Sequence, residues 1–247
     1  MIKAFGASDV GCVRELNEDC FCLNIFDADK NEGFFILADG MGGHNAGEVA
    51  SQNVVKDIAD KLMRLKEDDI PENEISSFIS DAIKEANDHV YKMALENDDQ
   101  SGMGTTAVVA VVKGNKVFVA NVGDSRAYSI KENDISRITV DHSVVEELVL
   151  SGMITEEEAR NHPQKNIITR AVGTDKEVAV DLFERESEKE TALMLCSDGL
   201  CSMLDDKEIL EITTKYSNCE EAVQMLINRA KQNGGLDNIT VIFIRFI

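Results

Sequence analysis

Two apolar segments of this sequence end in the dipeptide Asp-Gly. One ends in Asp39-Gly40 and the other in Asp198-Gly199, and a third acid, Asp237, comes just before the last apolar segment. A carboxylate at the edge of a protein core is costly unless a positive group meets it. Three carboxylates with backbone carbonyls and water form the oxygen shell that Mg²⁺ or Mn²⁺ prefers. The pattern therefore indicates a divalent-cation site, and the alternative of ordinary Asp-Gly turns stays open here.

The segment 8–19 adds a basic residue to this set of acids. It places Arg14 close to the acidic pair Glu18-Asp19, immediately before another apolar segment. The planar guanidinium of arginine can grip a phosphate through two parallel hydrogen bonds, a geometry that lysine cannot match. Arg14 is therefore a candidate phosphate ligand, with an ordinary surface arginine as the alternative.

These candidate residues stand at the ends of elements that the hydrophobic pattern predicts. Short apolar runs predict strands at 2–8, 19–25, 33–38, 105–112, 116–121, 126–130, 135–139, 178–186, 191–196 and 239–246. Apolar residues at helical spacing predict helices at 46–66, 74–95, 205–214 and 219–233.

The order of these elements predicts the fold class. Strands in runs followed by helices in runs indicate an α+β protein rather than a doubly wound α/β protein. Two packed antiparallel β-sheets flanked by helices, an α/β/β/α sandwich, would use every predicted element. The strands between 105 and 139 predict an antiparallel meander, and the polar segment 142–166 predicts a loop with short helices. We expect a single domain over residues 1–247.

Composition narrows the classes of partner. The 247 residues are 43% hydrophobic, and 25 basic against 46 acidic residues give 25 − 46 = −21. Such a charge repels polyanions, so we expect no nucleic-acid partner and no binding to an anionic membrane. The N-terminus lacks the pattern of a signal peptide, and no apolar run approaches the ~20 residues of a membrane span. The six cysteines lack paired zinc spacing, which favours reduced thiols in a cytoplasmic protein.

Eight motifs along the chain resemble those of the metal-dependent type 2C (PPM) family of protein serine/threonine phosphatases, in its short bacterial form. They are Ser8–Asp19, Asp39–His44, Gly102–Thr106, Gly123–Ala127, Asp141–Ser143, Ile168–Gly173, Cys196–Leu200 and Gly235–Thr240. They occur in the family's order and cover nearly the whole chain. The resemblance implies a phosphoprotein phosphatase, a phosphoric monoester hydrolase that acts on phosphoserine and phosphothreonine.

The resemblance also implies a set of metal ligands. Asp39 matches the carboxylate that bridges two ions, Mn²⁺ or Mg²⁺, and the carbonyl of Gly40 matches a ligand of the second ion. Asp198 and Asp237 match ligands of the first ion. A water that the two ions share would be the nucleophile, because paired cations lower the pKa of water to about 7.

Other matches concern the surroundings of these ions. Glu18 matches a residue that contacts metal through water, and Arg14 matches the arginine that binds the substrate phosphate. Asp124 matches a residue that, in bacterial members, helps to hold a third ion together with Asp198. The segment 142–166 matches a variable flap beside the catalytic cleft.

The general acid is the place where this chain departs from animal members of the family. Those members carry a histidine directly after Asp-Gly, and this chain has Met41, which cannot donate a proton. His44 and a metal-bound water are the candidates for that role.

The resemblance leaves several alternatives open. The fold could serve a non-catalytic regulator that binds phosphoproteins, or an enzyme that hydrolyses small phosphoesters. We expect phosphorylated proteins as substrates, an opposing Ser/Thr kinase as a partner in signalling, and a monomeric protein.

Overall fold

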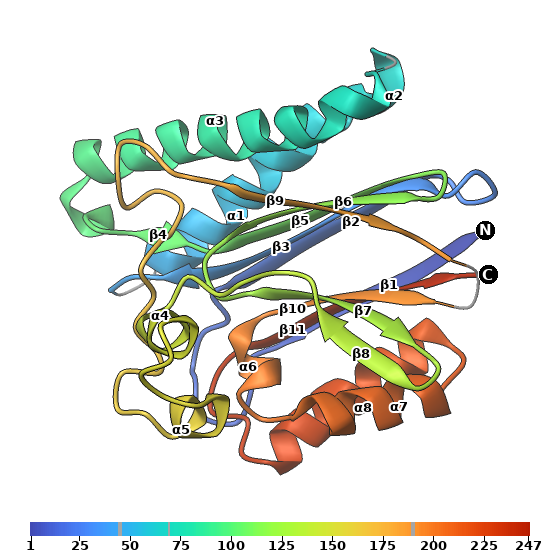
Figure 1. Ribbon diagram of the computed structural model, residues 1–247. Coiled ribbons are helices and arrows are strands. Elements are labelled where there is room, and N and C mark those ends of the chain that lie inside the picture. Colours follow the sequence, from blue (N-terminus) through green and yellow to red (C-terminus); the bar gives the residue numbers. More distant parts are fainter. Residues whose placement is uncertain (44–45, 69, 189–190) are drawn as a thin grey trace.

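The strands form two antiparallel sheets that lie face to face, and the helices cover the two outer faces (Figure 1). The computed structural model describes residues 1–43, 46–68, 70–188 and 191–247. Within these residues, the first sheet has the order β1 (Ile2–Asp9), β11 (Ile239–Phe246), β10 (Ala192–Cys196), β7 (Arg126–Lys131) and β8 (Asp134–Arg137). The second has the order β2 (Asp19–Asp27), β3 (Glu32–Met41), β5 (Ala107–Lys113), β6 (Lys116–Val122) and β9 (Asp181–Glu186). The short strand β4 (Gly104–Thr105) pairs with the end of β3.

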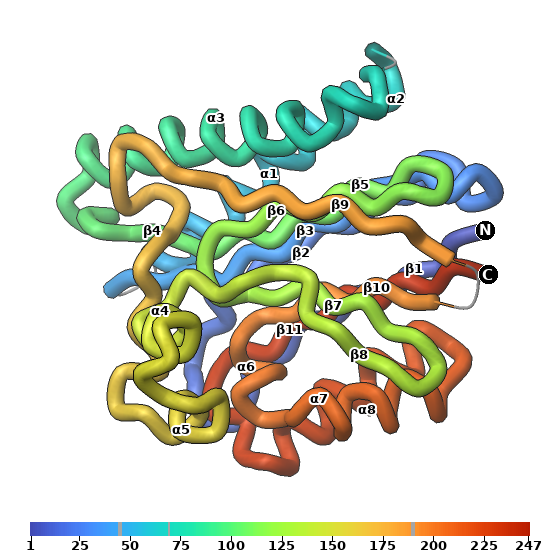
Figure 2. The backbone as a smooth tube through the Cα atoms, viewed as in Figure 1, coloured from blue at the N-terminus to red at the C-terminus, as the bar shows by residue number. Residues whose placement is uncertain are grey.

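Helices form the outer layers of the sandwich. The second sheet is covered by α1 (Ala46–Leu62) and α3 (Ile75–Glu96), with α2 (Arg64–Glu67) and the 3-10 turns Glu72–Glu74 and Asp98–Gln100 at their ends. The first sheet is covered by α6 (Asp198–Cys201), α7 (Asp206–Lys215) and α8 (Cys219–Gln232). Two further short helices, α4 (Val144–Leu150) and α5 (Glu156–Arg160), lie at one end of the sandwich, as Figure 2 also shows. The predicted α/β/β/α sandwich is therefore confirmed.

Three apolar clusters hold the four layers together. Side chains on opposite faces of a strand alternate, so in β3 Phe34 and Ile36 pack under α1 and α3, whereas Phe35 and Leu37 pack between the sheets. Because both faces of β3 are buried, its sequence is a continuous apolar run rather than an alternating one. Apolar burial of this kind stabilises by about 25 cal/mol per Å² removed from water.

The predicted strand 178–186 begins only at Asp181 in the structure, and two larger predicted features also differ. The predicted helix 46–66 is interrupted at Met63, between α1 and α2. The predicted meander is wrong as a single sheet, because β5 and β6 pair in one sheet while β7 and β8 pair in the other. The chain changes sheets at Gly123, whose φ of +106° is a conformation that glycine adopts without strain.

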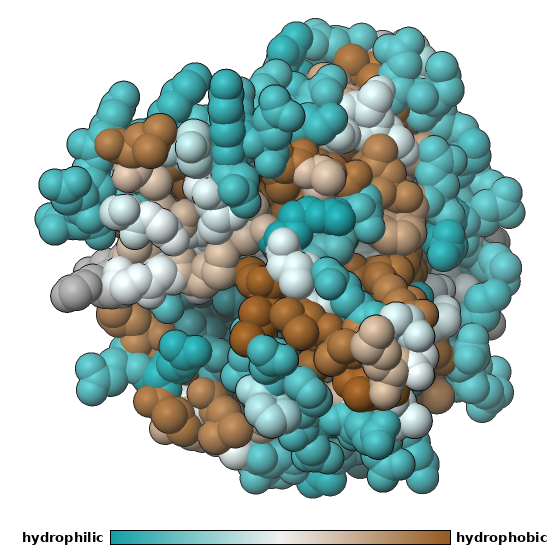
Figure 3. All heavy atoms as spheres, turned by 60° about the vertical axis from the view of Figure 1, so that its left-hand side comes forward, coloured by the Kyte–Doolittle hydropathy of each residue, from teal (hydrophilic) through white to brown (hydrophobic). Residues whose placement is uncertain are grey.

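The outer surface agrees with the acidic composition. Hydrophilic side chains cover most of the face that includes the left-hand side of Figure 1, and hydrophobic ones gather toward its middle (Figure 3). None of the helices in the described ranges is both long and apolar enough to cross a bilayer.

The two termini lie side by side, and the Met1 amino group donates to the Ile247 carbonyl at 2.9 Å.

Candidate active site

A cavity of about 210 Å³ collects the acids that stand at the strand ends. Its lining includes the end of β3, the start of α6, the loop before β11 and the turn between β6 and β7. These segments come from both sheets, so the cavity lies where the two sheets end together. All seven site residues predicted from the sequence line this one cavity: Arg14, Glu18, Asp39, Gly40, Asp124, Asp198 and Asp237.

The end of β3 positions Asp39 and Gly40. The backbone N–H of Asp39 donates to Thr106 Oγ1 at 2.9 Å, and its carbonyl accepts from the Thr106 N–H at 2.9 Å. Gly40 lies against the first turn of α1, where an added Cβ would be 2.1 Å from the Gly47 carbonyl oxygen. A side chain at position 40 would therefore push α1 away from the strand that carries Asp39.

The first sheet positions Asp198 and Asp237. Asp198 is the first residue of α6, directly after β10 and Ser197. Asp237 lies in the loop before β11, which Asn238 ties to the N-terminal segment. The side chain of Asn238 donates to the Val10 and Leu16 carbonyls at 3.0 and 2.8 Å and accepts from the Glu18 N–H at 2.8 Å.

Asp19 is a half-buried acid beside this cavity that is not among the candidate residues predicted from the sequence. It pairs in register with Asp39 across β2 and β3. Its Oδ2 accepts from Ser197 Oγ at 2.8 Å and from Thr240 Oγ1 at 2.6 Å, so it joins the second sheet to the first. The sequence signal that could have indicated Asp19 is its position directly after Glu18, at the start of a predicted strand.

Mutual repulsion and burial keep these acids from ionising freely. Burial raises the pKa of Asp198 to about 6, and the charge of Asp237 contributes to that rise. Burial together with Asp198 raises the pKa of Asp124 to about 8, and burial raises the pKa of Asp19 to about 7. The pKa of Asp39 lies well above its ordinary value because it is buried and faces Asp19, Asp198 and Asp124. Carboxylates in such a cluster share protons or require a cation.

Arg14 is the single basic residue among the described residues that line the cavity. Its Nη2 donates to Asp237 Oδ2 at 2.8 Å, and this contact raises the pKa of Arg14. Burial raises the pKa of Glu18, and the nearby Arg14 opposes that rise. The single positive charge of Arg14 therefore does not balance the negative charge of the acids that line the cavity.

The donor set fits divalent cations, because carboxylates from both sheets and the backbone of Gly40 line one cavity. Within the described ranges, no three His, Cys, Asp or Glu side chains already form a metal site. The charge of Asp198 raises the pKa of Asp39, so the two carboxyl groups lie close enough to affect each other's ionisation. Glu18 Oε1 and Asp19 Oδ1 are buried and have no hydrogen-bond partner among the described residues. Hard oxygen donors with surplus negative charge are the ligands of Mg²⁺ and Mn²⁺.

The segment 142–166 borders the cavity. It contains α4, capped by Ser143, and α5, which begins with a capping box between Thr155 and Glu158. Asn166 at its end and Ile168, two residues beyond it, line the cavity. Met41 also lines it, whereas His44 lies outside the described residues.

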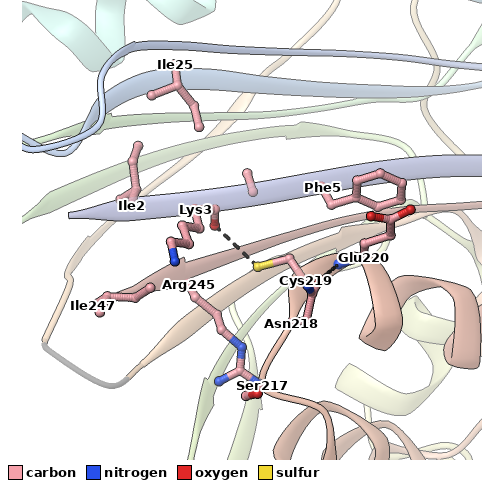
Figure 4. A pocket seen from close by; sticks show the side chains of 11 residues that line it. Ile2, Lys3, Phe5, Ile25, Ser217, Asn218, Cys219, Glu220, Arg245 and Ile247 are labelled. Carbon is pink, nitrogen blue, oxygen red and sulfur yellow. Dashed lines mark hydrogen bonds between the residues drawn. The ribbon is translucent and has the colours of Figure 1, made fainter.

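A larger cavity of about 590 Å³ lies at the other end of the sandwich, near the termini (Figure 4). Two of its polar side chains bond within the fold: Cys219 Sγ donates to the Lys3 carbonyl at 3.5 Å, and Arg245 Nη2 donates to the Tyr216 carbonyl at 2.7 Å. Glu220 is the single acidic side chain among its described lining residues. The smaller cavity, with its acids and Arg14, is therefore the candidate active site.

Comparison with known proteins agrees with this geometry. The model of the protein phosphatase 2C family matches residues 4–148. The serine/threonine phosphatase stp of Listeria monocytogenes is 39% identical over 237 residues, which cover 96% of this chain and 93% of the relative. The crystal structure of the serine/threonine phosphatase Stp1 from Staphylococcus aureus has a TM-score of 0.92 at 40% identity and covers 100% of this chain and 96% of that chain. The structure of the catalytic domain of PstP in complex with two manganese ions has a TM-score of 0.86 at 34% identity, with 99% and 97% covered.

The fold and the acid-lined cavity thus define a phosphoryl hydrolase. The chain belongs to the protein phosphatase 2C family, and it is a phosphoprotein phosphatase.

Proposed function

We propose that this protein phosphatase hydrolyses phosphoserine and phosphothreonine in proteins, with a water held between two divalent cations as the nucleophile. The relatives that cover nearly its whole length carry the name serine/threonine phosphatase. The observation that carries the proposal is the convergence of Arg14 and the acids of both sheets on one cavity. When bound, the cations supply an acidified water and offset charge on the phosphoryl oxygens.

The residues of the cavity would divide the work among them. Asp39 would hold both ions, because its carboxyl faces acids of both sheets, Asp19 on one side and Asp198 on the other. Asp198 and Asp237 would hold the first ion, and the Gly40 carbonyl would hold the second. At neutral pH the free energy of such a cluster would be lowest when cations replace the protons that the carboxylates share.

The remaining roles concern substrate and outer ligands. Arg14 would bind the phosphate, and its half-exposed guanidinium is accessible from the mouth of the cavity. Glu18 would act through water, since its buried Oε1 has no partner among the described residues. Asp124 would hold a third ion with Asp198, the acid that most perturbs it. The choice between Mn²⁺ and Mg²⁺ would follow their supply in the cell.

We also propose that residues 1–247 act as one catalytic domain in which 142–166 is a flap beside the cleft. The phosphorylated substrates imply a Ser/Thr kinase that opposes the enzyme. We propose a monomer, because all seven site residues come from one chain. The six cysteines are free thiols, which supports a cytoplasmic location.

The test is hydrolysis of a phosphothreonine peptide and of small phosphoesters, with and without Mn²⁺, by the wild type and by Asp39→Asn. We expect Mn²⁺-dependent turnover that favours the peptide and that Asp39→Asn abolishes. Binding without turnover would indicate a regulator of this fold, and turnover confined to small esters would indicate a metabolic phosphoesterase.

A further inference from the structure

His142 is a buried residue at the root of the segment 142–166, outside the set of acids. Its exposed fraction is 6%. Its Nδ1 accepts from the backbone N–H of Gly123 at 2.9 Å, and its own backbone N–H donates to the Gly123 carbonyl at 3.0 Å. Two hydrogen bonds from one residue therefore hold Gly123, the residue before Asp124, at both its N–H and its carbonyl.

The acceptor role of Nδ1 determines how the ring is used. A neutral imidazole that accepts at Nδ1 carries its proton on Nε2. Nε2 lies 3.2 Å from Asp181 Oδ2, so it donates to that carboxylate. The other oxygen of Asp181 accepts from Arg170 Nη1 at 2.7 Å, and this nitrogen also lies 2.9 Å from Nε2. Asp181, which Arg170 holds in place, thus orients the ring so that Nδ1 faces Gly123.

The same residue joins the two ends of the segment 142–166. The His142 carbonyl accepts from the Thr169 N–H at 2.8 Å, and Ser143 forms a β-bridge with Ile168. Ile168 lines the active-site cavity. A displacement of either end of the segment is therefore transmitted to His142.

The turn that carries Asp124 has little freedom of its own. Asn121 Nδ2 donates to the Gly123 carbonyl at 3.1 Å, and Ser125 Oγ lies 2.8 Å from Thr106 Oγ1, the group that also holds the Asp39 backbone. The Gly123 N–H is a further polar backbone group of this turn, and its acceptor is His142 Nδ1. The direction of the Gly123–Asp124 peptide thus depends on where His142 lies.

We propose that His142 is a positioning residue that aims the Asp124 carboxylate at Asp198 through the Gly123 N–H, and that couples the segment 142–166 to cation binding at Asp124. The proposal rests on the proposed function, in that Asp124 is taken to hold a cation. It assigns His142 no contact with substrate or metal.

Two substitutions separate this role from simple packing. His142→Asn keeps an oxygen near the position of Nδ1 and can still accept from Gly123. His142→Gln places its polar atoms near the position of Nε2 and loses the acceptor for Gly123. Both variants remove the ring, so a packing role predicts similar effects for the two.

The first measurement is direct Mn²⁺ binding by calorimetry, with Asp124→Asn as the reference for loss of the site. We expect His142→Gln to weaken the lowest-affinity Mn²⁺ site at least tenfold, as Asp124→Asn does, and His142→Asn to stay within threefold of wild type. Equal losses in both variants, or no loss in His142→Gln, would overturn the proposal. Absence of the two tighter Mn²⁺ sites from the wild type would instead refute the proposed function.

The second measurement is tryptic cleavage at Arg160 and Lys165, which are exposed within the segment. We expect saturating Mn²⁺ to slow this cleavage at least threefold in wild type and His142→Asn, and to leave it unchanged in His142→Gln and Asp124→Asn. Equal protection in all four proteins would contradict the coupling.

If His142→Gln does not fold, an NMR measurement on the wild type still tests the link between His142 and the weakest cation site. The N–H···N hydrogen bond between Gly123 and His142 should give a scalar coupling between two ¹⁵N nuclei. We expect the ¹⁵N shift of Nδ1 to move as Mg²⁺ fills the weakest site. An Nδ1 signal that does not respond to Mg²⁺ would refute the proposal.

Discussion

Removal of one buried charge should stabilise the metal-free protein. Asp198→Asn replaces a carboxylate whose charge acts on Asp39, Asp124 and Asp237 with a neutral amide of nearly the same shape. The pKa of Asp198 is about 6 against an ordinary 3.8, and at 1.36 kcal/mol per pKa unit the difference corresponds to about 3 kcal/mol. The acids of the cavity therefore store destabilising energy that the substitution releases.

The pH dependence follows from the sign of this difference. The folded protein binds the proton more tightly than the unfolded chain, so stability falls as the pH rises from about 4 to about 6 and stays at the lower level above that. Asp198→Asn should therefore gain about 3 kcal/mol at pH 7.5 and only about 1 kcal/mol at pH 4.5. In a protein of this size, 3 kcal/mol raises the Tm by about 6–12 °C.

Mn²⁺ should reverse the order of the two proteins. A ligand at 1,000 times its Kd stabilises the folded state by about 4.1 kcal/mol, which exceeds the gain of about 3 kcal/mol from the substitution, and only the wild type keeps all the carboxylates for this stabilisation. The assay is urea unfolding with a chelator and again with millimolar Mn²⁺. Asp88→Asn, at an exposed position of α3, is the control and should change stability by less than about 0.5 kcal/mol. A metal-free Asp198→Asn that is no more stable than wild type at pH 7.5 would refute the view that these acids repel one another.

Three further changes test the cavity. Asp39→Asn should lower turnover on the order of 10³-fold, about 4 kcal/mol, while the circular dichroism spectrum stays native; near-normal turnover at saturating Mn²⁺ would remove Asp39 from the metal site. Arg14→Ala should mainly raise KM, since a phosphate clamp grips substrate and transition state alike, and Arg14→Lys should recover only part of the loss; full recovery would show that a point charge suffices. Gly40→Ala should cost about 3 kcal/mol of unfolding free energy, because its Cβ would meet the Gly47 carbonyl; an unchanged urea midpoint would contradict the packing of α1 described above.

The sequence predicts this fold well where burial is uniform along an element. β3 and β5 are buried on both faces, so their apolar runs stand out from the polar segments around them. The fold predicted from such runs agrees with the structure, and so does the presence of two short helices in 142–166.

Other features depend on contacts that no local pattern contains. The sheet that β7 joins is decided at Gly123 by one turn, and the spacing of strands is the same for either choice. The helix α6 has four residues, too few to show a helical period. Asp19 resembles any acid before a strand until Ser197 and Thr240, far away in the chain, enclose it.

The cavity draws its acids from both sheets, and this makes cation binding a measure of how the sheets are spaced. Asp39 belongs to one sheet, Asp198 and Asp237 flank strands of the other, and the apolar layer between them includes Leu37 and Leu195. An ion bound by ligands from both sheets would cross-link the two sheets at one end of the sandwich. Substitutions in the inner layer would then change the affinity for the ion without touching it, because they would change the distance between the carboxylates of the two sheets.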